Sequence, residues 1–224
     1  MKKFLLDIVA VAEKDLRIEL RTRQTLFASF LFVALMLFIF NFSFSASTES
    51  LEKLAGGMLW IVIAFSGTIM ISHLTSRERE DRINEGLLLS GCGPVALFFS
   101  KFITALIFMM GIEIITIPLF MIFFNFSFGD EFPLLLTVLA LGTIGYASVG
   151  TLFSTLLCHI KFRELLLPII FYPVIIPLLV AATQATSALL AGERPKEILF
   201  MFGFNVILVT ASALLYEFVV EDPI

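Results

Sequence analysis

The sequence predicts an all-α membrane protein in which six transmembrane helices follow an amphipathic interfacial helix. Of its 224 residues 59% are apolar, and its mean hydropathy of +1.01 exceeds what a soluble domain of this size can bury. A hydrocarbon core about 30 Å thick takes roughly 20 helical residues per crossing. The apolar runs are continuous and lack the alternation of barrel strands. The predicted spans are residues 26–44, 55–72, 102–124, 134–157, 165–185 and 198–219.

Residues 1–24 precede the first span and fit a helix that lies along the membrane surface. At about 100° per residue, basic side chains gather on one stripe and apolar side chains on the opposite half, which is the pattern of an interfacial helix. The basic stripe comprises Lys3, Lys14, Arg17 and Arg21, and the apolar half comprises Leu5, Ile8, Val9, Leu16 and Leu20.

Asp15 and Glu19 break the pattern of this leader helix. They project near the edge of the apolar half and, four residues apart, repel each other. We therefore expect both to have partners. Either they form a solvated edge, or they contact another subunit or basic groups of the cytoplasmic loops.

The distribution of Lys and Arg predicts the orientation of the chain. Of the 15 basic residues, only Lys53, Arg194 and Lys196 fall on one side of the predicted spans, and all others fall on the side of the termini. By the positive-inside rule both termini are cytoplasmic, and so is the stretch 75–94. Cys92 and Cys158 then lie at the reducing face, without the spacing of a metal site.

The fourth span carries small residues at four-residue spacing. Such a ridge lets helix backbones approach closely, so we expect this span to be central in the bundle or at a subunit contact. The ridge comprises Thr143, Ala147, Thr151 and Thr155. The fifth span contains Pro168, Pro173 and Pro177, which we expect to kink or break it, as a static kink or as a moving hinge.

Glu113 lies near the middle of the third span, where an ionised carboxylate is costly. Two interpretations remain open, an interhelical hydrogen bond with a structural role or a position along a substrate or proton route. The two histidines, His73 and His159, map to the cytoplasmic ends of spans. We interpret them as interfacial residues rather than as paired haem ligands.

The sequence has no motif for catalysis of its own. It contains no GxxxxGK[ST], HExxH or GxSxG pattern and no Gly-Lys pair, so it cannot form a P-loop and we expect no catalytic residue. ATP would act only through a partner ATPase. Nothing in the sequence predicts a metal site, a firmly bound cofactor or a nucleic-acid partner.

The stretch TSREREDRINEGLLLSGCGP, residues 75–94, is strongly charged and lies between two spans. Glu78 with Arg82, and Arg77 with Asp81, are spaced for ion pairs on a helix. Apolar residues follow, so a short docking helix parallel to the membrane is one interpretation and a solvated loop is the other. The candidate contact residues within the segment 75–93 are Arg77, Glu78, Arg79, Glu80, Asp81, Arg82, Glu85, Leu87, Leu88 and Leu89.

This segment resembles the coupling segment of ABC-type export permeases, in which a charged run ends in a Leu triplet ahead of a turn and a new span. The entry sequence EKDLRIELRTRQTL, residues 13–26, more narrowly resembles the start of the cytochrome c maturation protein B family, the haem-exporter permeases of bacteria and some organelles. The resemblance covers essentially the whole chain. One departure is that the proline expected directly after LLLS stands at Pro94, behind Gly91, Cys92 and Gly93.

The resemblance implies an ABC-2 type permease domain over residues 25–224, in a bacterial cytoplasmic (inner) membrane. It implies a homodimer that binds two copies of a cytoplasmic ATPase, together with a haem-handling membrane protein and a small single-span protein. The complex would use ATP to deliver haem, or to release a haem-loaded periplasmic chaperone, during c-type cytochrome biogenesis. Arg77 to Arg82 would contact the ATPase, with Asp15, Arg17 and Arg21 bracing that contact.

Three other functions remain open from the sequence alone. The cargo could be a lipid-linked glycan or a drug instead of haem. The chain could be a haem-binding scaffold that transports nothing. Ion-coupled secondary transport through Glu113 is disfavoured because no other predicted span carries a charge at comparable depth.

Overall fold

The computed structural model describes residues 2–43, 48–80, 93–126, 129–158, 160 and 162–221, and these are almost entirely helical. Six of the described helices are long and apolar enough to cross a membrane. The predicted all-α fold with six spans is therefore confirmed. The elements are α1 (Lys2–Thr22), α2 (Gln24–Ser43), α3 (Thr48–Glu80), α5 (Pro94–Phe124), a 3₁₀ turn η1 (Gly129–Glu131), α6 (Phe132–Leu156), α7 (Arg163–Leu190) and α8 (Ile198–Glu221).

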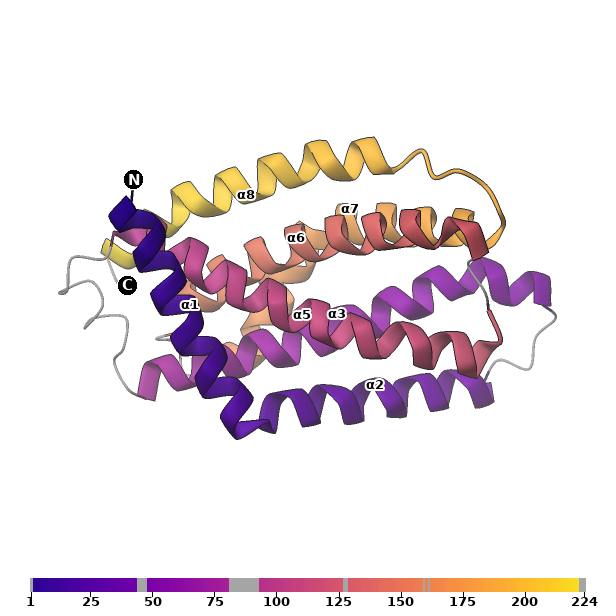
Figure 1. Cartoon of the computed structure of the whole chain (residues 1–224), viewed down its shortest axis with the longest axis horizontal. Helices are drawn as coiled ribbons and strands as arrows, with labels where there is room; N and C mark the ends of the chain where they lie inside the picture. The colour runs from indigo at the N-terminus through magenta and orange to yellow at the C-terminus, as the bar shows by residue number, and fades with distance from the viewer. Residues whose placement is uncertain are drawn as a thin grey trace.

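The six long helices form one elongated bundle, and successive helices run in opposite directions along it (Figure 1). The start of α1 and the end of α8 lie at the same end of the bundle, which we call the terminal end; the opposite end is the far end. α1 crosses the bundle obliquely near the terminal end and meets α2 at Arg23. Arg23 takes a left-handed φ of 55°, and the chain changes direction there from the oblique α1 to α2.

Helix α6 lies within the bundle, where it packs against α3, α5, α7 and α8. The ridge of small residues predicted from the sequence is buried along its whole length. A methyl group added at Gly142 would stand 1.9 Å from the ring of Trp60, and one at Gly145 would stand 2.3 Å from Leu178. The small residues are thus what allows neighbouring helices to lie this close to α6.

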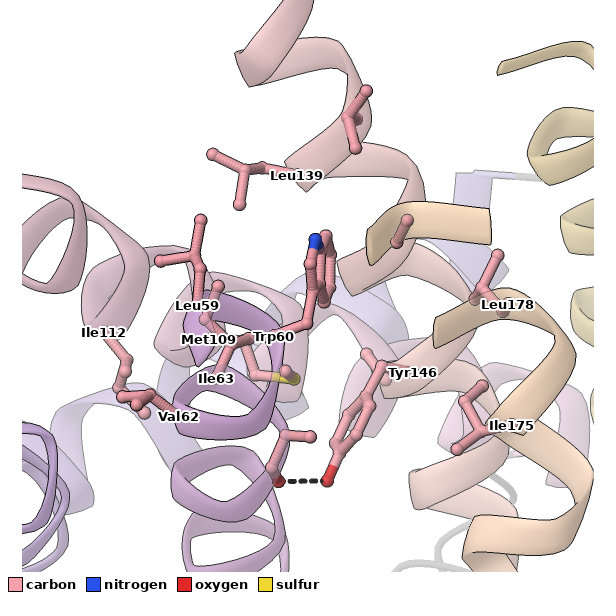
Figure 2. Close-up of a cluster of buried hydrophobic side chains, with 14 of the residues drawn as sticks. Leu59, Trp60, Val62, Ile63, Met109, Ile112, Leu139, Tyr146, Ile175 and Leu178 are labelled. Atoms are coloured by element: carbon pink, nitrogen blue, oxygen red, sulfur yellow. Dashed lines mark hydrogen bonds between the residues drawn. The ribbon is translucent and has the colours of Figure 1, made fainter. Parts of the chain in front are cut away.

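Large side chains from four of these helices pack together. Figure 2 shows residues of α3, α5, α6 and α7 converging around Trp60 and Tyr146. Both aromatic side chains are almost completely buried, at 2% and 0% exposure. Burial at this level identifies the α3–α6–α7 contact as the core of the bundle.

The prolines of the fifth span do not break it. α7 runs as one helix from Arg163 to Leu190 with Pro168, Pro173 and Pro177 inside it. The prediction of a break is therefore wrong, since packing of Phe171, Ile175 and Leu178 in the core holds the helix together. Whether the prolines permit a hinge motion stays a prediction.

The apolar half predicted for α1 has two different environments in the structure. Ile8 is buried against α5, where it packs with Ala96. Leu5, Val9 and Leu20 are exposed instead, at 55%, 61% and 55%. One edge of the helix therefore packs on the protein, and the other edge is free to lie in lipid.

The tight contact at Gly142 gives a direct test of this packing. We expect Gly142→Ala to lower the free energy of unfolding by about 1–3 kcal/mol, because the ring of Trp60 has to move to admit the methyl group. Thermal unfolding of the detergent-solubilised protein measures the change. Gly111→Ala is the matched control: Gly111 is also helical, has no atom within 4 Å of an added methyl group, and should be neutral or slightly stabilised. Equal stability of the two variants would contradict the packing.

Candidate functional site

The charged stretch predicted to receive an ATPase begins on the last turn of α3. Arg77, Glu78, Arg79 and Glu80 continue the helix of the second span and do not begin a separate one. The remaining predicted contact residues, Asp81, Arg82, Glu85 and Leu87 to Leu89, lie outside the described residues. Since the apolar span ends at His73, the helix carries these four charges about 6–10 Å beyond it.

With this extension α3 reaches from one end of the bundle to the other (Figure 1). It has 33 residues, which corresponds to about 50 Å. Its charged end lies at the terminal end of the bundle, which α1 crosses (Figure 1). The structure therefore brings the start of the predicted coupling segment and the leader helix to the same end.

The charged residues of α1 point in two directions. Arg17 is exposed and pairs with Glu13, and Arg21 is also exposed. Asp15 is 2.8 Å from the Lys14 ammonium and its side chain is only 13% exposed, while Glu19 is 2% exposed. The solvated-edge interpretation of Glu19 is therefore wrong, because it lies on the face that packs toward α5.

Near the start of α5 lies a buried cation. Lys101 is in the second turn of that helix and only 8% exposed. Buried charges are costly unless groups of opposite sign or hydrogen bonds compensate them.

Glu113 is buried within the bundle at 5% exposure and links α5 to α6. The hydroxyl of Thr143 donates a hydrogen bond to Oε1 of Glu113. This is the interhelical bond that the sequence left as one of two interpretations. A nearby apolar hollow, lined by Leu26, Phe30, Val33, Ile112 and Ile115, has a volume of about 20 Å³, far below the roughly 300 Å³ of a small-molecule pocket.

A second polar cluster joins α3, α6 and α7, and the sequence analysis missed it. The Thr68 hydroxyl is 2.6 Å from the Tyr146 hydroxyl, a bond drawn as the dashed line in Figure 2, and 3.1 Å from that of Tyr172. The carbonyl of Ala64 lies within hydrogen-bond distance of both the Thr68 and the Tyr146 hydroxyl, so one of them donates to it while the other donates within the cluster. A tyrosine within an apolar span needs a partner for its hydroxyl, so the sequence contained a signal for this cluster.

Two further hydrogen bonds tie the same helices together. Nε1 of Trp60 donates to Oγ1 of Thr186, 3.0 Å away, which links α3 to α7. Nδ2 of Asn205 donates to the carbonyl of Leu141, 2.7 Å away, which links α8 to α6. The polar side chains of Trp60 and Asn205 therefore lie where two helices of the bundle contact each other.

The structure describes one of the two histidines. His73 is half-buried at the end of the apolar part of α3, and His159 lies outside the described residues. Among the described residues no three His, Cys, Asp or Glu side chains lie close enough to hold a metal ion.

Comparison with known proteins gives two matches that span most of the chain. A family model described as CcmB protein matches residues 6–221. A curated protein of Pseudomonas aeruginosa, named Heme exporter protein B, is 24% identical over 179 residues, which is 80% of each chain.

The hydrogen bond between Thr143 and Glu113 predicts the effect of removing its donor. We expect Thr143→Val to lower the free energy of unfolding by about 1–3 kcal/mol, since it leaves the buried carboxyl of Glu113 without this donor. Thr143→Ser keeps the hydroxyl and is the control. In a cycle with Glu113→Leu the two substitutions should couple by about 0.5–3 kcal/mol. Additive effects on thermal unfolding in detergent would show that the two residues do not interact.

Proposed function

Because the chain belongs to the CcmB family, we propose that it is the membrane subunit of an ATP-driven haem exporter that acts in c-type cytochrome biogenesis. The match over residues 6–221 carries this proposal. The printed name of the Pseudomonas aeruginosa relative supports haem as the cargo. The protein is a multi-pass membrane protein, and we place it in a bacterial inner membrane with both termini in the cytoplasm.

The energy for export has to come from another chain. The sequence has no P-loop, so a cytoplasmic ATPase would bind the complex and hydrolyse ATP. The charged end of α3 and the segment that follows it, residues 75–93, are the proposed contact. The exposed basic side chains of α1, Arg17 and Arg21, would brace it from the same end of the bundle.

Helix α3 is suited to transmit a force from that contact into the membrane. Its charged end is continuous with the segment that holds the Thr68 cluster and with Trp60, so a displacement of Glu80 moves the same rigid rod. Those two contacts reach α6 and α7. We infer that ATP-driven motion enters at the end of α3 and shifts α6 and α7 with it.

The remaining partners follow from the proposed role. A second copy of the chain and two ATPase subunits would form the transporter. A haem-handling membrane protein, a small single-span protein and a periplasmic haem chaperone would receive or deliver the haem. Haem would be the transported cargo, and we assign the chain no resident cofactor.

The proposed ATPase contact can be tested by exchanging charges without changing their sum. We expect Arg79→Glu together with Glu80→Arg to abolish copurification of the ATPase and to stop formation of holocytochrome c, because the order of charges at the end of α3 is reversed. Affinity purification from membranes and haem staining of c-type cytochromes provide the two measurements.

The matched control exchanges an exposed pair at the far end of the bundle, Glu193→Arg with Arg194→Glu. It should retain both the ATPase and the cytochromes. An intact complex with normal ATP turnover in the Arg79/Glu80 variant would show that the ATPase docks elsewhere. Normal holocytochrome formation after deletion of the whole gene would overturn the proposed cargo.

A further inference from the structure

Two arginines lie where the interfacial helix α1 meets the first span, α2. Arg21 is in the last turn of α1, and Arg23 stands between the two helices. Both side chains are exposed, and the corner that carries them lies at the edge of the bundle (Figure 1). We call Arg21 and Arg23 the corner arginines.

The corner arginines have no acidic partner in the part of the chain that the structure describes. Arg17, one turn earlier on α1, differs from them because it pairs with Glu13. A guanidinium group binds a phosphate through two parallel N–H···O bonds. The corner therefore exposes two groups that suit a phosphate and that no carboxylate of the described residues occupies.

The corner lies at the depth where a bilayer has its phosphates. The apolar span of α2 begins at Thr25, so Arg23 precedes that start by about 3 Å along the helix axis and Phe27 follows it by about 3 Å. Phe27 is 67% exposed. Over this short rise the outer surface changes from guanidinium to an aromatic ring, as a phospholipid changes from headgroup to acyl chain.

Apolar side chains continue on both sides of the corner arginines. Leu20 of α1 is exposed, and so are Phe30 and Leu31 in the next turn of α2. These side chains can contact acyl chains while the guanidinium groups contact a phosphate. A free phosphate ion has no acyl chain for them, so the corner fits a phospholipid better than a soluble anion.

Arg23 holds a backbone conformation in which glycine or asparagine is the usual residue. Its φ of 55° lies in the left-handed region. The backbone there stays bonded, because the N–H of Arg23 donates to the carbonyl of Glu19 and its own carbonyl accepts from the N–H of Phe27. Residues in such sparsely populated conformations concentrate where a side chain holds a ligand. At this position that side chain is the exposed guanidinium.

The end of α8 carries a charge of the opposite sign. This helix also ends at the terminal end of the bundle (Figure 1), and its exposed Glu217 lies three residues before the span ends at Val220. A carboxylate repels an anionic headgroup. The terminal end therefore offers an anionic lipid an attractive position at the corner arginines and a repulsive one at Glu217.

We propose that the corner arginines bind the phosphate of an anionic phospholipid such as phosphatidylglycerol, whose acyl chains lie against Phe27 and Leu31. Each basic residue near an anionic membrane surface strengthens binding about fivefold. Because this lipid contacts both α1 and α2, it holds the interfacial helix at a fixed angle to the first span.

This inference goes beyond the proposed function and needs only the membrane position of the two helices. Arg23 has no part in the proposed ATPase contact, whereas Arg21 does. A guanidinium has five N–H donors, so Arg21 can bind a lipid phosphate and still face the ATPase. The ATPase is nevertheless the competing partner, and the second experiment below separates the two.

The first experiment measures which lipid lies beside Phe27. The full chain with a Phe27→Trp reporter is reconstituted into vesicles of phosphatidylethanolamine and phosphatidylglycerol, and one of the two lipids is brominated. Bromine quenches tryptophan fluorescence only at short range. The chain's single native tryptophan, Trp60, is 2% exposed and gives a background that the chain without the reporter measures. We expect stronger quenching by brominated phosphatidylglycerol.

Substitutions at the corner identify the groups that select the lipid. We expect Arg21→Gln together with Arg23→Gln to lower the relative affinity for phosphatidylglycerol about ten- to thirtyfold. Lysine at both positions keeps the charge and should retain most of the preference. Arg17→Gln is the matched control, an exposed arginine of the same helix that already has a partner, and should leave the preference nearly unchanged. Thermal unfolding checks that each variant is folded.

Four results would overturn the proposal. Equal quenching by the two brominated lipids means that the corner selects neither. A preference that survives the double glutamine substitution arises elsewhere, and an equal loss in Arg17→Gln means that the charge of α1 as a whole attracts the lipid. Loss of the preference in millimolar inorganic phosphate, but not in sodium chloride of equal ionic strength, means that the corner binds free phosphate.

A second reporter tests whether the preference is local. Leu214→Trp lies on the outer side of α8, one turn from Glu217, and Leu214 is exposed like Phe27. We expect no preference for phosphatidylglycerol at this position. A preference as strong as that at Phe27 would mean that the whole terminal end attracts anionic lipid, and the corner site would be refuted.

The second experiment uses the complex purified from native membranes, and native mass spectrometry counts the phosphatidylglycerol that it retains. The double glutamine variant should lose this lipid and keep the ATPase, which we propose docks on residues 75–93. Loss of the ATPase with the lipid still bound would show that the arginines serve the ATPase, and it would refute the lipid site. Neither result depends on haem as the cargo, which the formation of holocytochrome tests separately.

Discussion

The absence of hydrogen-bonding solvent inside a bilayer is the constraint on which the rest of this structure depends. Polar groups that the spans carry inward are stabilised by partners on another helix or on their own backbone. Thr143 with Glu113 joins α6 to α5, Tyr146 with Ala64 joins α6 to α3, and Asn205 with Leu141 joins α8 to α6. All three bonds include α6. Helix α6, with its many small residues, therefore takes part in several of these bonds, because close approach brings polar atoms within reach.

The same constraint explains why α3 could act as a lever in the proposed mechanism. A helix that slides freely would transmit nothing, whereas α3 is held at two heights, by Trp60 with Thr186 and by Thr68 with Tyr146 and Tyr172. Both attachments are short side-chain bonds in a tightly packed core, and interiors of that density pass on displacement with little compression. The charged end beyond His73 is outside the apolar part of the helix, and it is the part that we propose a soluble partner contacts.

The spans could be predicted from the sequence because their signal, a continuous apolar run, is local. The place of α6 within the bundle could be predicted for the same reason, from residues such as Thr143 and Thr151 at four-residue spacing. Partners across the bundle could not, since nothing local to Tyr146 indicates that it meets Thr68, 78 residues away. Glu19 was misplaced because helical periodicity defines an apolar half but not which edge of that half packs on protein. Charge suggested that a surface helix begins at Arg77, whereas the helix of the second span continues through Glu80. The rest of the predicted docking segment lies outside the described residues.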